Sequence, residues 1–439
     1  MSPGAQVAAA IDILATVDTG ERPADEVAAD YFRRRRYIGA KDRARIAGHV
    51  YTVLRHRPGL DWWIEKYSLE IGPRNRVLAA LVLTEAWRPE AVAGCCDGDR
   101  FRPAPLSEAE KRLVHGLAKH TLRHPEMSRA VRNDLPEWLT PYLGRVFGKG
   151  LEREVAALNT PAPTDLRVNS LKADRAMARA ALAAEGVMTE PTPWSPIGLR
   201  LAERVTLGGR TALKDGLVEV QDEGSQLTAL LVDARPGMRV VDFCAGAGGK
   251  TLALAASMAN RGRLVACDVS VHRLERATRR LRRSGVGNVE RRTLTSERDK
   301  WVKHHAGGFD RVLVDAPCLG IGAWRRNPGD KWRVTKEDLA HLVVRQREIV
   351  SNAARLVRPG GRLIYATCSL LHEENEAQAE AFLAATPGFS VFPTARVWHE
   401  TIGGAAPGSD RYLRLTPARH GTDGFFVAIF ERQSCPTAS

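Results

Sequence analysis

The chain has 439 residues, of which 44% are hydrophobic and 26% are charged, a composition typical of folded globular proteins. A chain of this length folds into about two or three domains with separate cores. No apolar run approaches the roughly 20 residues of a membrane-spanning helix. The first residues carry no basic segment ahead of an apolar one, so a secretory signal is not expected and the cytoplasm is the predicted location.

The net charge is +14, from 65 basic residues against 51 acidic ones, and most of the basic residues are arginines. Guanidinium groups suit bidentate phosphate contacts and stacking on bases, so nucleic acid is a natural partner. The alternative is a general preference for arginine on solvated faces. Composition by itself leaves both interpretations open.

The N-terminal part, residues 1–140, is predicted to be an all-α domain. Apolar residues recur at helical spacing in the stretches 7–14, 42–55, 77–87 and 107–120. Short turns separate these stretches, which is typical of a small helical bundle. The run from Arg33 to Arg36 is either an RNA contact or a solvated helix end, and four adjacent like charges favour the solvated end.

Residues 141–234 are predicted to form a small α+β module. Prolines at positions 136, 141, 161 and 163 mark the boundary before it. Short strands are expected at 166–169, 199–201 and 217–220, with a helix at 175–185 that ends at Gly186. The turn Pro236-Gly237 then leads into a third domain, residues 235–432, and residues 433–439 are predicted to be a loose tail.

The third domain is organised around a glycine-rich turn. The apolar run 238–242 ends in Asp242, the turn 244–249 follows, and good helix formers come next, which indicates a nucleotide-binding strand–turn–helix unit. A phosphate-binding loop would need a glycine five positions before Gly249, where Cys244 stands. A second strand runs into Asp268, about where an acid binds ribose hydroxyls. We therefore predict a site for a nucleoside-type cofactor.

Further strands and helices alternate along this domain. Strands are expected at 309–315, 361–366 and 424–430, and a helix at 271–281. The predicted fold is therefore α/β, with a doubly wound, Rossmann-like parallel sheet. Four arginines share one face of the 271–283 stretch, and this face is either a phosphate-binding stripe or simply exposed. They are Arg276, Arg279, Arg280 and Arg283.

The seven cysteines show no Cys-x-x-Cys pair and no histidine at zinc spacing, so neither a metal site nor a disulfide framework is expected. Cys318 and Cys368 each follow the carboxyl end of a strand, where open α/β sheets bind ligands. If the two strands are neighbours, both thiols face one pocket beside the glycine-rich turn. Four others are interpreted as small buried apolar residues. They are Cys95, Cys96, Cys267 and Cys435.

Three motifs taken together resemble those of the RNA 5-methylcytosine methyltransferases of the Fmu/Sun/Nop family. They are residues 242–251, the segment Asp315-Ala316-Pro317-Cys318 and the segment Ala366-Thr367-Cys368-Ser369. Residues 167–169, 220–226 and 420–426 support the resemblance, which runs from about 166 to 432. Residues before 140 are similar, more weakly, to the NusB-like RNA-binding bundle of the bacterial type that methylates small-subunit ribosomal RNA.

The resemblance implies S-adenosylmethionine as the methyl donor and assigns residues to it. Asp268 holds the donor's ribose, and Asp315 borders both the donor and the target base. Lys250 and Asp315 hold the base and stabilise the charge that develops on its ring. The residues implied to wrap the donor are Cys244, Ala245, Gly246, Ala247, Gly248, Gly249 and Lys250.

The resemblance also implies covalent catalysis. Cys368 is the nucleophile that attacks C6 of cytosine, and Cys318 assists release of the enzyme after methylation. The Pro317-Cys318 pair also resembles the nucleophile motif of DNA cytosine methyltransferases, and the second cysteine in 367–369 points to the RNA branch. The target base must leave any stack to be reached.

The chain departs from the family pattern at three places. Gly246-Ala247 stands where the family usually has alanine and proline, so a less rigid turn is expected. Leu319 and Ile321 replace small polar residues after Cys318, and Leu294 stands near the acid expected at the adenine. None of these changes affects the two thiols.

The tryptophans of 324–326 and 331–333 lie beside cations, which suits either RNA stacking or core packing. The hypothesis is a monomeric, metal-free methyltransferase acting on C5 of cytosine in RNA, with ribosomal RNA as the expected partner. An inactive RNA-binding assembly factor with the same fold is the first alternative. A methyltransferase acting on small molecules or protein is the second.

Overall fold

The computed structural model describes residues 1–408 and 411–434. The chain forms two compact units, each treated below by itself. The first consists of Met1–Thr160 and Trp324–Lys336, and the second of Pro161–Ala323 and Glu337–Ser439. The predicted tail falls largely outside the described residues, as does Cys435.

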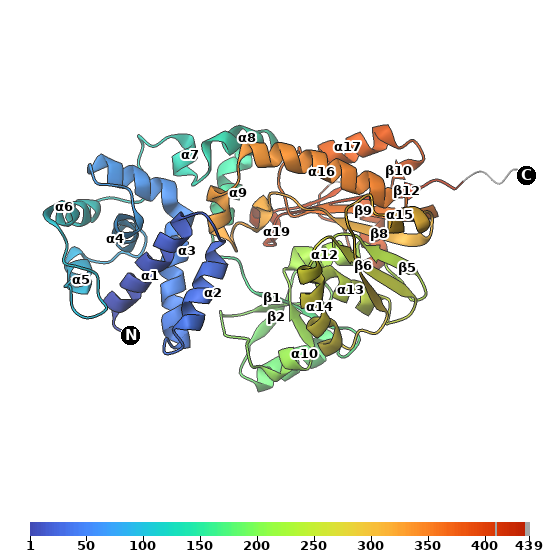
Figure 1. Ribbon diagram of the computed structural model, residues 1–439, viewed down its shortest axis with the longest axis horizontal. Coiled ribbons are helices and arrows are strands. Elements are labelled where there is room, and N and C mark those ends of the chain that lie inside the picture. Colours follow the sequence, from blue (N-terminus) through green and yellow to red (C-terminus); the bar gives the residue numbers. More distant parts are fainter. Residues whose placement is uncertain (409–410, 435–439) are drawn as a thin grey trace, which may run out of the picture. The chain divides into compact units, whose positions relative to one another are not determined.

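The first unit is helical, as predicted (Figure 1). Its core gathers Leu14, Val50, Trp63, Leu78 and Leu113, all of them nearly inaccessible to solvent. The Ser107 side chain and Glu110 form a capping box that begins α6. The helices are α1 (Pro3–Asp18), α2 (Ala24–Arg34), α3 (Ala40–Lys66), α4 (Pro73–Leu83), α5 (Pro89–Cys95), α6 (Glu108–Leu117), α7 (Arg129–Arg132), η1 (Glu137–Leu139), α8 (Thr140–Phe147), η2 (Gly148–Gly150) and α9 (Leu151–Leu158).

Residues Trp324–Lys336 belong to this helical unit although they lie far along the chain. They contain the short helix η4 (Pro328–Trp332). The buried ammonium group of Lys331 donates to the carbonyl oxygens of Arg55, at 3.3 Å, and Asp134, at 3.2 Å, and to the Asn159 side chain. The Trp332 indole donates to the Leu54 carbonyl oxygen at 2.6 Å. Trp324 is buried, which agrees with core packing for this residue.

The second unit begins with a small antiparallel sheet in the order β2-β3-β1-β4. Leu166, Val168, Leu182, Leu199 and Val218 form its core against α10. The predicted α+β module is therefore present. Its elements are β1 (Asp165–Val168), α10 (Arg175–Ala184), β2 (Thr189–Pro191), β3 (Gly198–Leu201), α11 (Thr211–Lys214) and β4 (Val218–Val220).

An eight-stranded sheet follows, in the order β10-β12-β9-β8-β5-β6-β7, with β11 paired to β12. The pairs among β5, β6, β7, β8 and β9 are parallel, and β12 runs antiparallel to β9. This confirms the predicted Rossmann-like sheet. The strands are β5 (Arg239–Asp242), β6 (Arg263–Asp268), β7 (Val289–Thr293), β8 (Phe309–Asp315), β9 (Val357–Thr367), β10 (Phe389–Val391), β11 (Leu413–Leu415) and β12 (Phe425–Arg432).

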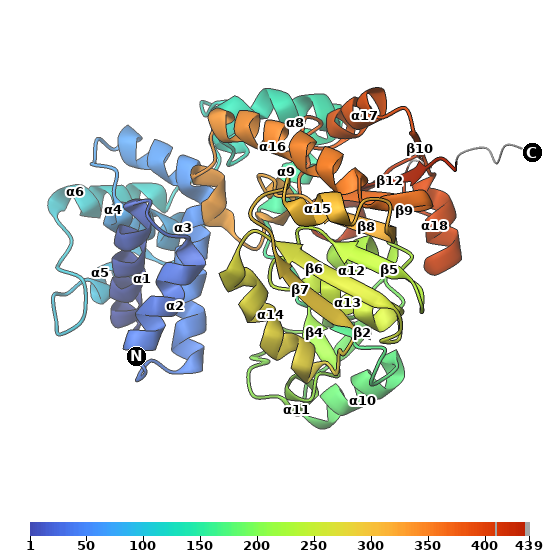
Figure 2. The ribbon, with the colours of Figure 1, turned by 45° about the vertical axis from the view of Figure 1, so that its right-hand side comes forward.

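Helices cover both faces of this sheet (Figures 1 and 2). Val241 and Val312 face the core under α15, α16 and α17, whereas Val240 and Leu313 face the core under α12, α13 and α18. Successive strand residues point to opposite faces, so apolar runs such as 312–314 are buried on both sides. The helices are α12 (Glu223–Leu230), α13 (Gly249–Ser257), α14 (Val271–Arg283), α15 (Lys300–His304), α16 (Lys336–Ala354), α17 (Glu376–Ala385), α18 (Thr394–Thr401) and α19 (Pro417–His420).

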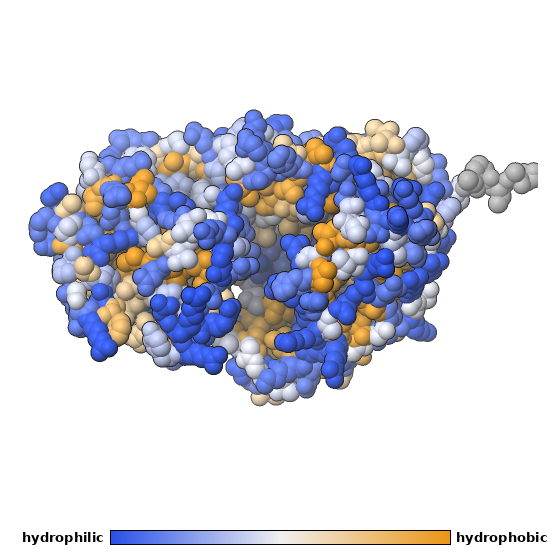
Figure 3. Space-filling view, viewed as in Figure 1, coloured by the Kyte–Doolittle hydropathy of each residue, from blue (hydrophilic) through white to orange (hydrophobic). Residues whose placement is uncertain are grey.

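Hydrophilic residues predominate on the face of the molecule seen in Figure 3. Across residues 1–408 and 411–434, no helix is both long enough and apolar enough to cross a membrane.

Candidate active site and donor turn

The two strand-end cysteines meet. Strands β8 and β9 are parallel neighbours, with Asp315 opposite Ala366 in the register, so the loops after both strands leave the same edge of the sheet. The Sγ atoms of Cys318 and Cys368 lie 3.4 Å apart, and both residues are half-buried. The hydrogen bond with Cys368 and burial raise the pKa of Cys318 well above its usual value. Cys318 therefore keeps its proton beside Cys368.

A partly buried ion pair lies at the same edge. Lys250, at the start of α13, donates to Oδ2 of Asp315 at 2.7 Å, and its ammonium group lies 5.3 Å from the centre of the Phe425 ring. Burial lowers the pKa of Lys250. The ion pair and hydrogen bond with Asp315, and to a smaller extent the charge of Cys368 when ionised, raise it, and the net result is a raised pKa. Lys250 is thus a positive charge held close to the nucleophilic sulfur predicted from the sequence.

The glycine-rich turn is closed by Asp268. Its two carboxylate oxygens accept the backbone N–H groups of Gly246, at 2.9 Å, and Ser270, at 2.8 Å. Gly246 and Gly248 have φ angles of 55° and 79°, which favour glycine. Nothing lies within 4 Å of a Cβ placed on Gly246, so a ligand has room to approach the backbone there. The turn therefore fits a nucleoside-type donor.

Two arginines that the sequence analysis did not single out for this role stiffen the turn. Arg280 of α14 donates to the Ala247 carbonyl oxygen at 2.9 Å, and the buried Arg167 of β1 donates to that of Gly249 at 2.8 Å. Glu219 of β4 pairs with Arg280 and with Arg283. Hydrogen bonds from two other elements thus hold the turn at Ala247 and at Gly249. The roles of Arg167 and Arg280 are visible only where β1, α14 and the turn come into contact, because neither residue stands in a local pattern that predicts contact with the turn.

Two further titratable side chains belong to this part of the chain: Asp242, at the end of β5, and Cys244, the first residue of the turn. Asp242 is fully buried and accepts the Thr251 hydroxyl at 2.7 Å, and burial raises its pKa to about 7. Cys244 is half-buried, and desolvation together with the nearby Asp315 and Asp242 raises its pKa well above the usual value. Cys244 is therefore a neutral thiol beside the turn.

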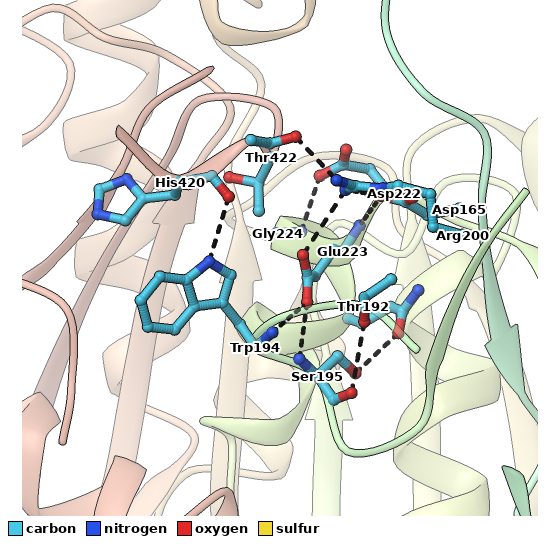
Figure 4. Close-up of polar contacts among 12 residues, drawn as sticks. Asp165, Thr192, Trp194, Ser195, Arg200, Asp222, Glu223, Gly224, His420 and Thr422 are labelled. Carbon is cyan, nitrogen blue, oxygen red and sulfur yellow. Dashed lines mark hydrogen bonds and ion pairs between the residues drawn. The ribbon is translucent and has the colours of Figure 1, made fainter. Parts of the chain in front are cut away.

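A buried polar cluster ties the small module to this edge (Figure 4). The Glu223 carboxylate accepts the N–H groups of Trp194, at 2.6 Å, and Ser195, at 2.8 Å, and burial raises its pKa. The Trp194 indole donates to the His420 carbonyl oxygen at 3.1 Å, and Asp222 accepts the N–H of Asp423. The segment 420–424, which leads to Phe425, is thereby held against the start of α12.

That segment also supports both cysteine loops. The N–H of Gly424 donates to the Gly322 carbonyl oxygen at 2.9 Å, and the N–H of Gly322 donates to the Cys368 carbonyl oxygen at 2.9 Å. A Cβ on Gly322 would clash with the carbonyl group of Gly424, so the backbones approach at a distance that only glycine permits. The loops after β8 and β9 and the segment before β12 form one packed group.

The predicted site residues therefore gather at one edge of the large sheet. The turn 244–249, Lys250, Asp268, Asp315 and the two cysteines lie at the carboxyl ends of β5, β6, β8 and β9. Cys96 and Cys267 are buried and Cys95 is half-buried. Leu294, near the expected adenine acid, is buried, and its N–H donates to the Asp268 carbonyl oxygen at 3.0 Å. Within the described part of the chain, no group of three or more His, Cys, Asp or Glu side chains is arranged to hold a metal ion.

A doubly wound sheet with this turn and these strand-end groups defines an S-adenosylmethionine-dependent methyltransferase. The family model described as 16S rRNA methyltransferase RsmB/F matches residues 229–431. A model for the ferredoxin-like domain of RsmF/B-like methyltransferases matches residues 135–207. The chain belongs to the RsmB/F family of rRNA methyltransferases, and the resemblance drawn from its motifs is confirmed.

Curated relatives match over most of their length. The probable ribosomal RNA small subunit methyltransferase B of Bacillus subtilis is 31% identical over 71% of this chain and 69% of the relative. The ribosomal RNA small subunit methyltransferase B of Yersinia pseudotuberculosis is 30% identical over 89% of this chain and 91% of the relative.

Solved structures share the fold. The crystal structure of PH0851 superposes with a TM-score of 0.79, at 24% identity, over 98% of this chain and 100% of that one. A methyltransferase homolog protein from Pyrococcus horikoshii has a TM-score of 0.59, at 27% identity, over 70% of this chain and 100% of that one. NSun6 from the same organism, determined with SFG, has a TM-score of 0.60 at 21% identity over 68% of this chain and 99% of that one.

Proposed function

We propose that this protein methylates C5 of cytosine in small-subunit ribosomal RNA, with Cys368 as the nucleophile. The observation that carries the proposal is the pair of thiols, 3.4 Å apart, beside the Lys250–Asp315 ion pair. Cytosine C5 is a poor nucleophile, and addition of a thiolate at C6 makes it electron-rich. The names of the relatives support ribosomal RNA as the substrate.

The Cys368 thiolate forms a bond to C6 of the ring, and the ring electrons move to C5. C5 then takes the methyl group of bound S-adenosylmethionine, and the remainder of the donor leaves as S-adenosylhomocysteine. The proton on C5 passes to water, its electron pair re-forms the C5–C6 double bond, and the bond between sulfur and C6 breaks to give back the Cys368 thiolate and the aromatic ring. Cys318, next to the leaving sulfur, assists this release.

The charged pair has two roles in the proposal. Lys250 places a positive charge near Cys368, and the thiolate is the form of a cysteine that attacks. Lys250 and Asp315 then hold the base and stabilise the charge that develops on the ring. The turn 244–249 and Asp268 hold the donor.

RNA contacts are proposed for the exposed face of α14 and for the helical domain of residues 1–140. Of the four arginines that the sequence placed on one face, Arg276 and Arg279 are exposed, whereas Arg280 and Arg283 pair with Glu219. Arg273 and Arg282 of α14 are also exposed. The edge strand β7 adds the exposed Arg291 and Arg292. A row of guanidinium groups suits a phosphate backbone. The small module, residues 141–234, would position RNA at the catalytic domain, residues 235–432. We also propose that the protein acts as a monomer in the cytoplasm.

The test uses the full-length protein, labelled S-adenosylmethionine and ribosomal RNA. We expect label at cytosine C5, loss of activity in Cys368→Ala, and a covalent enzyme–RNA adduct on a denaturing gel in Cys318→Ala. Cys95→Ala, a cysteine outside the site, serves as the control and should keep normal turnover.

Methylation that persists in Cys368→Ala would reject this residue as the nucleophile. Normal turnover without an adduct in Cys318→Ala would remove the release role. Donor binding in calorimetry without any methyl transfer would instead favour an inactive assembly factor.

A further inference from the structure

Two adjacent buried residues, Glu374 and Asn375, lie directly before α17 and behind the two cysteine loops. Both are completely inaccessible to solvent. The Tyr365 hydroxyl of β9 donates to the Glu374 carbonyl oxygen at 2.6 Å, and the Asn375 N–H donates to the His372 carbonyl oxygen at 3.1 Å. The backbone of the pair is therefore anchored to the strand that carries Cys368.

Glu374 holds the loop of Cys318. Its Oε1 atom accepts the N–H of Leu319 at 2.9 Å and the side-chain N–H of Gln346 at 2.9 Å. Gln346 also donates to the carbonyl oxygen of Pro317 at 2.9 Å. The residues on both sides of Cys318 are thus attached, directly or through one amide, to the same carboxylate.

Asn375 holds the loop of Cys368 in the same manner. Its side-chain N–H donates to the Ser369 carbonyl oxygen at 3.0 Å, and its Oδ1 accepts the Thr367 hydroxyl at 2.5 Å. The Thr367 oxygen in turn accepts the N–H of Ser369 at 3.2 Å. The residues on both sides of Cys368 are thus attached to one amide.

We propose that Glu374 and Asn375 are positioning residues for the two sulfurs, Asn375 chiefly for attack on C6 and Glu374 chiefly for release. The Glu374 carboxylate also interacts with the Ser369 side chain, so this adjacent pair connects the two loops. The inference rests on the proposed covalent function. The hydrogen bond with Cys368 and burial raise the pKa of Cys318, and a charge on Glu374 adds a smaller contribution, although burial also raises the pKa of Glu374.

The arrangement predicts that the two side chains affect different steps. Asn375→Ala frees the Cys368 loop, so formation of the covalent adduct should slow by about 100-fold, the scale of an ångström-sized misplacement. Glu374→Ala frees the Cys318 loop, so attack should proceed while the adduct accumulates, as in Cys318→Ala.

Glu374→Gln is the conservative variant, because its amide oxygen can still accept the Leu319 N–H. It should restore release and shift the pH profile of release, since it lacks the charge beside Cys318. A residue with a purely structural role would not change that profile. Glu380→Gln, an exposed carboxylate of α17, is the matched control and should behave as the unmodified protein.

The experiment follows adduct formation and decay by rapid quench and denaturing gel, with ribosomal RNA and S-adenosylmethionine. Donor affinity by calorimetry and the melting temperature report on folding. If Glu374→Ala does not fold, Gln346→Leu removes the support of the same loop from α16 and should also accumulate adduct.

The inference would be overturned if Asn375→Ala and Glu374→Ala slowed the same step, or if both left attack and release unchanged. Normal release of RNA by Gln346→Leu would also overturn it. An adduct in Cys318→Ala but none in Glu374→Ala or Gln346→Leu would likewise reject it while leaving the proposed function intact. Absence of an adduct even in Cys318→Ala, with normal turnover, would reject the release role of Cys318 on which the inference rests.

Discussion

At the scale of single residues, a hydrogen bond from Arg280 restrains the donor turn at Ala247. Ala247 stands in the donor turn at the position where the motif resemblance led to an expectation of proline, and its carbonyl oxygen accepts an N–H group of Arg280 at 2.9 Å. Glu219 anchors that arginine from the other side. A charge-assisted hydrogen bond is roughly twice as strong as a neutral one, so the guanidinium group restrains the Ala247 carbonyl group. The sequence led us to expect a less rigid turn, but the contact from Arg280 of α14 compensates for the missing proline.

Arg280→Met should weaken donor binding by about ten-fold or more, because a hydrogen bond to a charged group contributes about 1.5–3 kcal/mol. Calorimetric titration with S-adenosylmethionine measures the change. Arg279→Met, an exposed neighbour on the same helix, is the control. Equal affinities for the two variants would show that the turn does not depend on Arg280.

Several residue assignments followed from local pattern. Cys318 and Cys368 were predicted because each follows a strand of recognisable apolar sequence, whereas Asp315, the last residue of β8, was assigned its role through the motif resemblance. The contacts of Arg167 with the turn and of Glu374 with the Cys318 loop gave no such signal, since their partners are 82 and 55 positions away along the chain and become neighbours only in the fold. The partner of Asn375 is only 6 positions away, but no motif marked this residue.

At the scale of elements, helix α14 has one apolar face and one basic face. Leu274, Ala277 and Leu281 are buried against the sheet and α13, whereas arginines occupy the opposite face. β7, the outer strand on this side of the sheet, is itself basic. An outer strand and helix with this charge avoid edge-to-edge pairing and suit a polyanion.

The double variant Arg276→Gln, Arg279→Gln should lower RNA affinity and reduce the slope of log affinity against log salt by about two, because each lost phosphate contact removes about one unit. Filter binding or fluorescence anisotropy at several salt concentrations measures the slope. The matched control is Arg347→Gln, Arg355→Gln, two exposed arginines near α16. An identical slope in both double variants would assign the α14 arginines to a solvated face only.

At the scale of the whole molecule, the chain passes between its two units more than once. Residues 324–336 pack within the helical unit, only six positions after Cys318. The buried Lys331 is the centre of that packing, with two backbone carbonyl oxygens and the Asn159 side chain around it. Burial lowers the pKa of Lys331 from 10.5 to about 8.

The sign of the pH effect follows from proton binding. Below pH 8 Lys331 is charged in both states, and the folded state bears the full cost of a buried charge. Between about pH 8 and 10.5 the unfolded chain binds more protons than the folded chain, so stability from this group rises with pH by about 1.4 kcal/mol per unit.

Relative to Lys331→Met, the unmodified protein should therefore gain about 2–3 kcal/mol of unfolding free energy from pH 8 to 10. Urea unfolding followed by tryptophan fluorescence measures the difference. Lys336→Met, an exposed lysine of the same segment, is the control and should show no such trend. A difference that stays constant with pH would contradict a neutralised Lys331.

The sequence by itself determined the kinds of domain, the doubly wound sheet and the strand-end cysteines. These depend on local periodicity and glycine-rich turns, and neighbouring parallel strands bring their carboxyl ends to one edge whatever else surrounds them. Only the tertiary structure decided that arginines from β1 and α14 hold the donor turn, that Glu374 and Asn375 hold the two cysteine loops, and that residues 324–336 pack with the helical unit. Such contacts join distant segments through packing and burial, which no local pattern of residues encodes.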